Sequence, residues 1–319
     1  MDIRGLKRTA TELLDTHAAG LRRLIGIHSG VSLGFGLIMT LLQETLTHLA
    51  SSAGGGLDTL GQQAIFSTAQ TLLQFVEFAL IPFWTAGLLF ISLSYTKNCP
   101  QSPSSLLEGF RRFKPLLGYA LPVGLLYMGA AIAAGYLSGI FLFLTPYGTI
   151  LYKAAQQLMH DPAADLFTLL GSSRIPVMVC YMAIFAACFC LCGFPVHYRY
   201  RLAPYAIMDE ETPSGLKALF ISHTAMGGKL LQLLRLDISF WWFYLLELTT
   251  GLLPLCGVLL DSVAFQWGLL LVASAAQLAL HIWAKPKVEL TYALAYDALR
   301  HAPPPPPKAE KHPWRDFGC

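Results

Sequence analysis

The stretch LLGYALPVGLLYMGAAIAAGYLSGIFLFL, Leu116–Leu144, decides the fold of this chain. It contains no Asp, Glu, Lys, Arg or His, and at ~1.5 Å per helical residue it exceeds the ~30 Å hydrocarbon core of a bilayer. Arg111, Arg112 and Lys114 precede it closely, whereas the next basic residue after it is Lys153. Because basic residues collect on the cytoplasmic side of membrane proteins, the stretch predicts a membrane-spanning helix that starts in the cytoplasm.

Five further apolar stretches lie on either side of this one. They are Leu24–Leu49, Thr71–Tyr95, Ile175–Val196, Ile238–Leu260 and Val263–Trp283. All but two of the 22 Lys and Arg residues fall in alternate connecting segments and the two ends, and the exceptions are Lys153 and Arg174. This bias predicts an all-α membrane protein with six transmembrane helices and both termini in the cytoplasm.

The composition excludes a large soluble domain. Hydrophobic residues make up 55% of the chain and charged residues 13%, with a mean hydropathy of +0.52, whereas soluble domains carry about 25% charged residues. The net charge of +3 is placed beside the predicted spans, where it meets anionic headgroups at the cytoplasmic face. We therefore expect the lipid bilayer as a partner, with a membrane protein or a second copy as a possible further one, and no nucleic acid.

The chain divides into three predicted parts. Residues 1–23 form an amphipathic helix with Arg4, Lys7 and Arg8 on its basic face, which either lies among the inner headgroups or packs on the inner ends of the spans. Residues 24–300 form the six-helix transmembrane domain. Residues 301–319 form a proline-rich basic cytoplasmic tail, which we expect to be disordered.

A patterned surface helix is predicted between the fourth and fifth spans, over Pro213–Arg235. Thr212 and Pro213 are typical of a helix start, and Gly227–Gly228 predicts a bend where the helix turns into the membrane. Further interfacial helices are expected at the N-terminus and after the sixth span. The surface helix supplies the candidate contacts to the inner leaflet or to a partner, namely Ser222, Met226, Gly228, Lys229 and Arg235.

The segment Tyr198–Gly251 carries a resemblance to a known family. Its marks are Ala203-Pro204-Tyr205, Ser222, Met226-Gly227-Gly228-Lys229, Leu236, Ser239, Phe240, Trp242, Leu245, Thr249 and Gly251. This segment resembles the bacterial multi-pass membrane family catalogued as domain of unknown function 975. The resemblance implies a six-helix protein of the bacterial cytoplasmic (plasma) membrane, and it implies no reaction and no catalytic residues.

Ionisable side chains inside the predicted spans are candidates for an intramembrane polar site, because burying them in hydrocarbon is costly. Glu247 lies near the middle of the fifth span, where it could bind a cation, relay a proton, or remain a neutral acid bonded to another helix. Asp237 lies near the inner interface, with Arg235 or Lys229 as its expected partner. Glu44 and Glu77 belong to the outer half, where they either line a polar vestibule or are exposed near helix ends.

Other reactive residue types give weaker signals. His28 and His281 both belong near the inner face and could sense pH or bind a metal, or serve only as packing. Cys188 and Cys192 share a helix face, but without a CxxC pattern they are expected to be apolar filler. No phosphate-binding glycine loop, HExxH or GxSxG is present. We therefore predict no enzyme activity, no metal and no cofactor.

Two functions remain open from the sequence. The first is a non-enzymatic membrane protein that organises, senses or assists at the inner leaflet through its surface helix. The second is a small transporter or channel that uses Glu247 as its site. No inverted repeat with paired broken helices is visible in the sequence, which counts against transport.

Overall fold

The computed structural model describes residues 2–52, 59–160, 170–209, 214–258 and 263–300. Within these residues the regular elements are all helices, so the predicted all-α fold is confirmed. Six long helices coincide with the six apolar stretches: α1 (Ile3–Ser52), α2 (Thr59–Thr96), α4 (Phe113–Phe143), α7 (Arg174–Tyr200), α11 (Trp241–Val258) and α12 (Val263–Trp283).

Four helical segments are long and apolar enough to cross a membrane. They are Ile3–Leu46, Phe113–Phe143, Pro176–Met208 and Phe265–Trp283, and a shorter apolar segment covers Leu80–Thr96. Most of their side chains are not buried inside the protein, because in a bilayer the hydrocarbon acts as the solvent for apolar surface. The chain is therefore built as a membrane protein.

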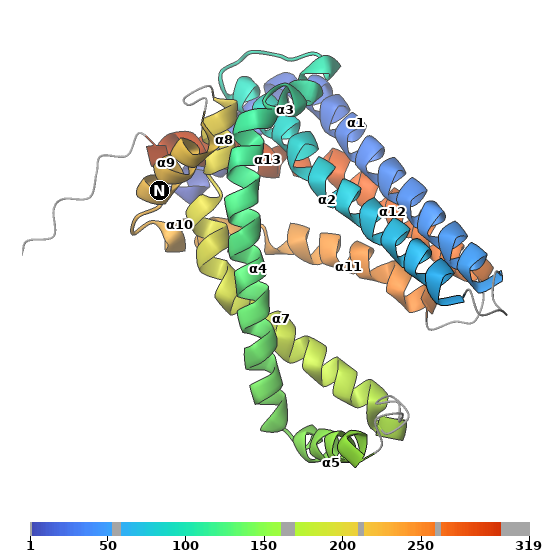
Figure 1. Ribbon diagram of the computed structural model, residues 1–319. Helices are drawn as coiled ribbons and strands as arrows, with labels where there is room; N and C mark the ends of the chain where they lie inside the picture. Colours follow the sequence, from blue (N-terminus) through green and yellow to red (C-terminus); the bar gives the residue numbers. More distant parts are fainter. Residues whose placement is uncertain (1, 53–58, 161–169, 210–213, 259–262, 301–319) are drawn as a thin grey trace, which may run out of the picture.

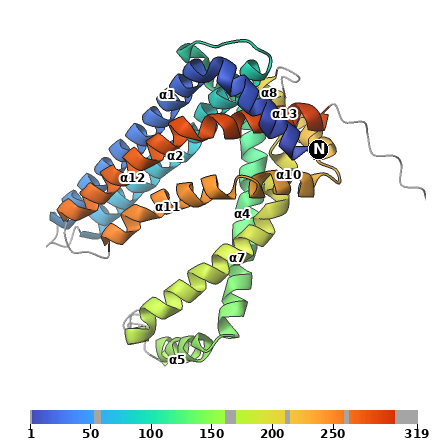
Figure 2. The ribbon, with the colours of Figure 1, turned by 180° about the vertical axis from the view of Figure 1, so that it is seen from behind.

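The long helices form two arms that diverge from one end, as both Figure 1 and Figure 2 show. In the first arm, α1 packs on α2 and α12, and α11 packs on α12. In the second arm, α4 packs on α7, and α5 (Tyr147–His160) lies at the far tip (Figure 1). Within the described residues, the second arm has extensive contacts with the rest of the protein only at the end where the arms converge.

Short helices cover this convergent end, and together with the N-terminal part of α1 we call them the cap. They are η1 (Pro103–Leu107), α3 (Glu108–Arg111), α8 (Ala203–Met208), α9 (Gly215–Ala225), α10 (Leu230–Ile238) and α13 (Lys285–Arg300). The main hydrophobic core lies here, around Tyr205, Met226, Leu233, Phe240 and Tyr296. Burying each such side chain stabilises the fold by ~1.5–3 kcal/mol, so the cap is what holds the arms together.

The N-terminal amphipathic helix is continuous with the first span. α1 bends at His17, where φ is −122° and ψ is 18°, and not at the predicted boundary after residue 23. Its apolar face, including Ala10, Leu14 and Leu21, is buried in a cluster with residues of α2 and α13. Of the two arrangements open from the sequence, the structure has the packed one.

The surface helix is two helices, α9 and α10. The predicted bend at Gly227–Gly228 is confirmed, and Gly228 has φ of +73°, a left-handed conformation that favours glycine. The bend leads into α10 and not into the membrane, since α11 begins only at Trp241. The predicted start at Thr212–Pro213 and the tail 301–319 lie outside the described residues.

α13 follows α12 after a single residue, Ala284. Backbone hydrogen bonds continue through this joint, from the Ala284 N–H to the Leu280 carbonyl (2.8 Å) and from the Val288 N–H to the Ala284 carbonyl (3.4 Å). The joint therefore connects the last long helix rigidly to the cap.

Gly215 allows α9 to cross closely over α4. A Cβ atom at Gly215 would lie 2.2 Å from the Pro115 carbonyl oxygen and 2.4 Å from the Tyr119 nitrogen, both backbone atoms. On α4 itself, a Cβ at Gly139 would meet nothing within 4 Å. The two positions thus offer a matched test of this crossing.

We expect Gly215→Ala to destabilise the protein by ~1–3 kcal/mol, because the added methyl group pushes backbone against backbone. Thermal unfolding of the purified protein in mild detergent, followed by tryptophan fluorescence, measures the effect. Gly139→Ala is the control and should leave the unfolding temperature nearly unchanged. Equal unfolding temperatures for the two variants would contradict the close crossing.

Candidate functional site

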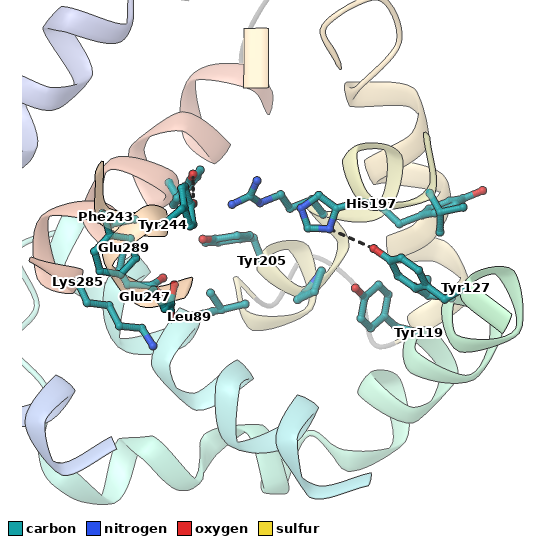
Figure 3. A pocket seen from close by; sticks show the side chains of 17 residues that line it. Leu89, Tyr119, Tyr127, His197, Tyr205, Phe243, Tyr244, Glu247, Lys285 and Glu289 are labelled. Atoms are coloured by element: carbon teal, nitrogen blue, oxygen red, sulfur yellow. Dashed lines mark hydrogen bonds between the residues drawn. The ribbon is translucent and has the colours of Figure 1, made fainter. Parts of the chain in front are cut away.

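A cavity of about 350 Å³ lies where the two arms meet at the cap. Its walls come from α2, α4, α7, α8, α11 and α13, and Figure 3 shows the side chains that line it. Aromatic side chains dominate the lining: Tyr119, Tyr127, Tyr200, Tyr205, Phe243, Tyr244 and Tyr292. Four charged residues join them, namely Arg201, Glu247, Lys285 and Glu289.

Helical spacing places these side chains on the cavity wall. On α13, Val288 and Glu289 lie three and four residues after Lys285, and Tyr292 lies seven residues after it, so the four share one face of that helix. The end of α7 and the start of α8 bring Arg201 and Tyr205 against α13, where Tyr205 stacks on Tyr296 with ring centroids 5.4 Å apart. The cavity therefore combines residues that are distant in the sequence.

Asp237 is the centre of a buried polar network behind the cavity. Arg201 Nη1 donates to Asp237 Oδ1 (2.9 Å) and Oδ2 (2.7 Å), and the hydroxyls of Tyr198 and Tyr292 also donate to this carboxylate. The side chains of Arg201 and Asp237 are only 19% and 17% exposed. The Arg201 guanidinium also lies 4.2 Å from the centre of the Tyr292 ring, and the Tyr292 and Tyr244 hydroxyls are 2.6 Å apart.

The prediction that Arg235 or Lys229 pairs with Asp237 is therefore wrong. Lys229 instead donates to the Leu299 carbonyl (3.2 Å), and Arg235 is exposed. The reason is the packing of α10 against α7, which turns Asp237 toward the end of α7 and Arg201. Sequence distance alone favoured the nearer lysine and arginine.

Glu247 belongs to a hydrogen-bonded chain that crosses three helices. Its Oε1 lies 3.3 Å from His281 Nε2, and His281 Nδ1 lies 3.0 Å from Ser29 Oγ. Ser29 and His281 are buried, while Glu247 is 35% exposed on its side chain and reaches the cavity. Glu247 is thus bonded to a neighbouring helix and at the same time faces open space.

His28 is buried but does not join this chain. Its ring stacks on Trp84 with centroids 5.1 Å apart, and neither ring nitrogen has a hydrogen-bond partner among the described residues. No group of three or more His, Cys, Asp and Glu side chains within the described residues is placed to hold a metal ion. The structure thus gives the two histidines different surroundings.

Glu289 and Lys285 were not identified by sequence reasoning, because α13 reads as an ordinary amphipathic helix. Within the described residues, Glu289 has no hydrogen-bond or ion-pair partner, although it lines the cavity. Burial raises the pKa of Glu289, against the smaller opposing effect of Lys285. Burial also raises the pKa of Tyr292. The spacing of Lys285, Glu289 and Tyr292 along one face was the signal that could have found this wall.

Of the remaining predicted intramembrane acids, Glu44 lies away from the cavity. Glu44 is half-buried toward the far end of α1, and the side chain of Glu77 lies outside the part that the structure describes. Glu44 lines neither of the two described cavities. Gln43 does border a second cavity of about 270 Å³ between α1, α11 and α12.

Most of the predicted inner-leaflet contacts are packing residues. Ser222 is fully buried and donates to the Arg199 carbonyl (2.7 Å), and Met226 is buried in the cap core. Lys229 is engaged by α13, and Gly228 forms the turn. Of the five candidates, only Arg235 offers an exposed charged side chain. The patterned motif of this segment serves to dock α9 and α10 on α7 and α13.

Comparisons with known proteins add no relative: no family model, no curated protein and no solved structure matches this chain.

We expect Asp237→Asn to lower the free energy of unfolding by ~3–5 kcal/mol, because it leaves the Arg201 charge buried without its counter-charge. Thermal unfolding in detergent measures the change. Glu12→Gln is the control, since Glu12 pairs with Arg8 at an exposed site where an ion pair contributes little. A loss for Asp237→Asn no larger than the control would show that the network does not hold the cap.

Proposed function

We propose that this chain is a six-span protein of the bacterial cytoplasmic membrane, non-enzymatic, that binds a membrane lipid from the inner leaflet. In this proposal both termini and the cap face the cytoplasm, which the placement of the Lys and Arg residues supports. α2 and α11 complete the six spans. Membership of the family catalogued as domain of unknown function 975 belongs to the same proposal and rests on the motif residues between Tyr198 and Gly251.

One observation carries the lipid-binding proposal: a polar and aromatic cavity lies at the end where two apolar arms diverge. Exposed leucines and methionines cover the arms, such as Leu125 and Met128 on α4 and Leu248 and Leu252 on α11. In a bilayer, acyl chains can cover such surfaces. A lipid with its chains against the arms would bring its headgroup to the level of the cavity.

The outer surface of the cap is suited to the headgroup region. Leu216 and Phe220 on α9 and Leu231 on α10 are exposed, and Lys217 and Arg235 are exposed on the same two helices. Exposed apolar side chains beside basic ones are typical of helices that lie at a membrane interface. Arg235 keeps the headgroup contact predicted for it, whereas the other exposed residues replace the buried Ser222 and Met226.

We expect Val196→Phe to reduce the lipid retained by the purified protein about tenfold, because the larger side chain fills the cavity that Val196 lines. Native mass spectrometry after extraction in mild detergent measures retained lipid. Val179→Phe, on the same helix but exposed away from the cavity, should retain lipid like the wild type. Equal retention by both variants would contradict headgroup binding in the cavity.

Transport is a second candidate, and the surroundings of α11 favour it. Glu247 borders both the cavity and an open groove with Leu248, Gly251 and Leu252. Gly251 also borders the second cavity, whose polar lining includes Ser32, Thr40, Gln43, Thr250, Ser274 and Gln277. A series of spaces thus follows α11 from the cap toward the far end of the arm.

If this series conducts protons, Glu247→Gln should lower proton uptake into proteoliposomes at least tenfold, since the amide cannot exchange a proton. Uptake is measured with an enclosed pH-sensitive dye under a potassium diffusion potential. Glu44→Gln, a span carboxylate away from the cavity, is the control and should keep wild-type uptake. Uptake by Glu247→Gln equal to the wild type excludes Glu247 as the site.

A further inference from the structure

We propose that the cavity selects a zwitterionic headgroup, with an ammonium group bound by Glu247 and Glu289 and a phosphate bound by Lys285. This inference rests on the proposed lipid-binding function and names the class of lipid. The ligand class is an aminophospholipid, and the recognised chemistry is a phosphodiester that carries an ammonium a few bonds away.

The carboxylates form the ammonium side of the site. Glu289 lines the cavity without a partner among the described residues. Glu247 is bonded to His281 through Oε1 only, so its second oxygen is available for a ligand. Figure 3 shows Glu247 and Glu289 at the same side of the cavity. An ammonium donor satisfies partly buried carboxylates with charge-assisted hydrogen bonds.

The aromatic lining favours the same charge. Seven of the lining residues are tyrosine or phenylalanine, and aromatic faces attract ammonium groups through the negative potential over the ring. Tyr205 lies in the middle of the view in Figure 3, between the Glu247 side and the Tyr127 side. The cavity therefore offers ring faces as well as carboxylates to a positive group.

Lys285 supplies the phosphate side. Lys285 and Glu289 are four residues apart on α13, a spacing that permits a direct ion pair, yet no ion pair joins them in the described structure. Arg201, the other cation of the lining, is neutralised by Asp237. Figure 3 shows Lys285 on the same side of the cavity as Glu247 and Glu289, so a phosphate bound by Lys285 would lie close to an ammonium bound by the two carboxylates.

The balance of charges decides between ligand classes. With Arg201 and Asp237 counted as a pair, two carboxylates face one ammonium side chain. An anionic headgroup without an amine would bring its charge against the two carboxylates, and a simple cation would place a second positive charge beside Lys285 without offering Lys285 an anion. A headgroup that carries both charges offers an ammonium to the carboxylates and a phosphate to Lys285, and like-charge contacts disfavour the other two classes.

The test uses the purified full-length protein, stripped of lipid in detergent and titrated by native mass spectrometry. The probes are three diacyl lipids. Phosphatidylethanolamine carries both charges, phosphatidylglycerol carries the phosphate alone, and a phosphate-free lipid with a primary ammonium group carries the positive charge alone. We expect phosphatidylethanolamine to bind at least tenfold more tightly than either of the others. The Glu289→Gln variant should no longer prefer phosphatidylethanolamine over phosphatidylglycerol. The Lys285→Gln variant should no longer prefer phosphatidylethanolamine over the cationic lipid. Glu12→Gln should change neither.

Three results would contradict the inference, and each identifies a different error. Equal binding of all three lipids by the wild type overturns headgroup selection but leaves lipid binding intact. Binding of none of them contradicts the proposed function itself. Soluble glycerophosphoethanolamine is added as a competitor: displacement of the lipid at equal concentration shows that the free headgroup is the ligand and overturns the lipid assignment. Unfolding temperatures of both variants confirm that they are folded, so a lost preference reports on binding.

Discussion

The buried contact between Asp237 and Arg201 ties the two halves of the protein together. Arg201 follows α7, in the second arm, whereas Tyr292, which donates to the same carboxylate, lies on α13 and so continues the first arm. Asp237 itself comes from α10. One carboxylate therefore links three elements, and the cavity exists because this contact fixes the distance between their ends.

The bilayer explains why so few contacts are needed elsewhere. A soluble protein with two diverging helical arms would expose large apolar surfaces to water, at ~25 cal/mol per Å². In hydrocarbon this cost is absent, so association of helices depends on close packing and polar contacts. Both are concentrated at the cap, in the Gly215 crossing and in the Asp237 network. Away from the cap, each helix of an arm needs to pack only on the other helices of the same arm.

The sequence predicted the helices because hydrophobic runs and basic flanks depend only on local residues. It also singled out Glu247 and Asp237, because an acid in or beside a span is conspicuous in any arrangement. The partners His281 and Arg201 could not be predicted, since they are 34 and 36 residues away and meet these acids only after packing. Ser222 and Met226 were predicted to be surface contacts. A helix that packs on other helices and a helix that lies on a membrane have the same spacing of apolar residues, so the sequence could not distinguish them. Glu289 was missed because charged residues are expected on any interfacial helix.

The joint at Ala284 has a mechanical consequence. One residue separates α12 from α13, and backbone hydrogen bonds continue through it. The two helices therefore cannot rotate independently of each other. A rotation of α13 that brings Glu289 and Lys285 closer to a ligand must turn α12 as well. Because α12 extends as far as Val263, a small angular change at the cap becomes a larger displacement at the far end of this helix.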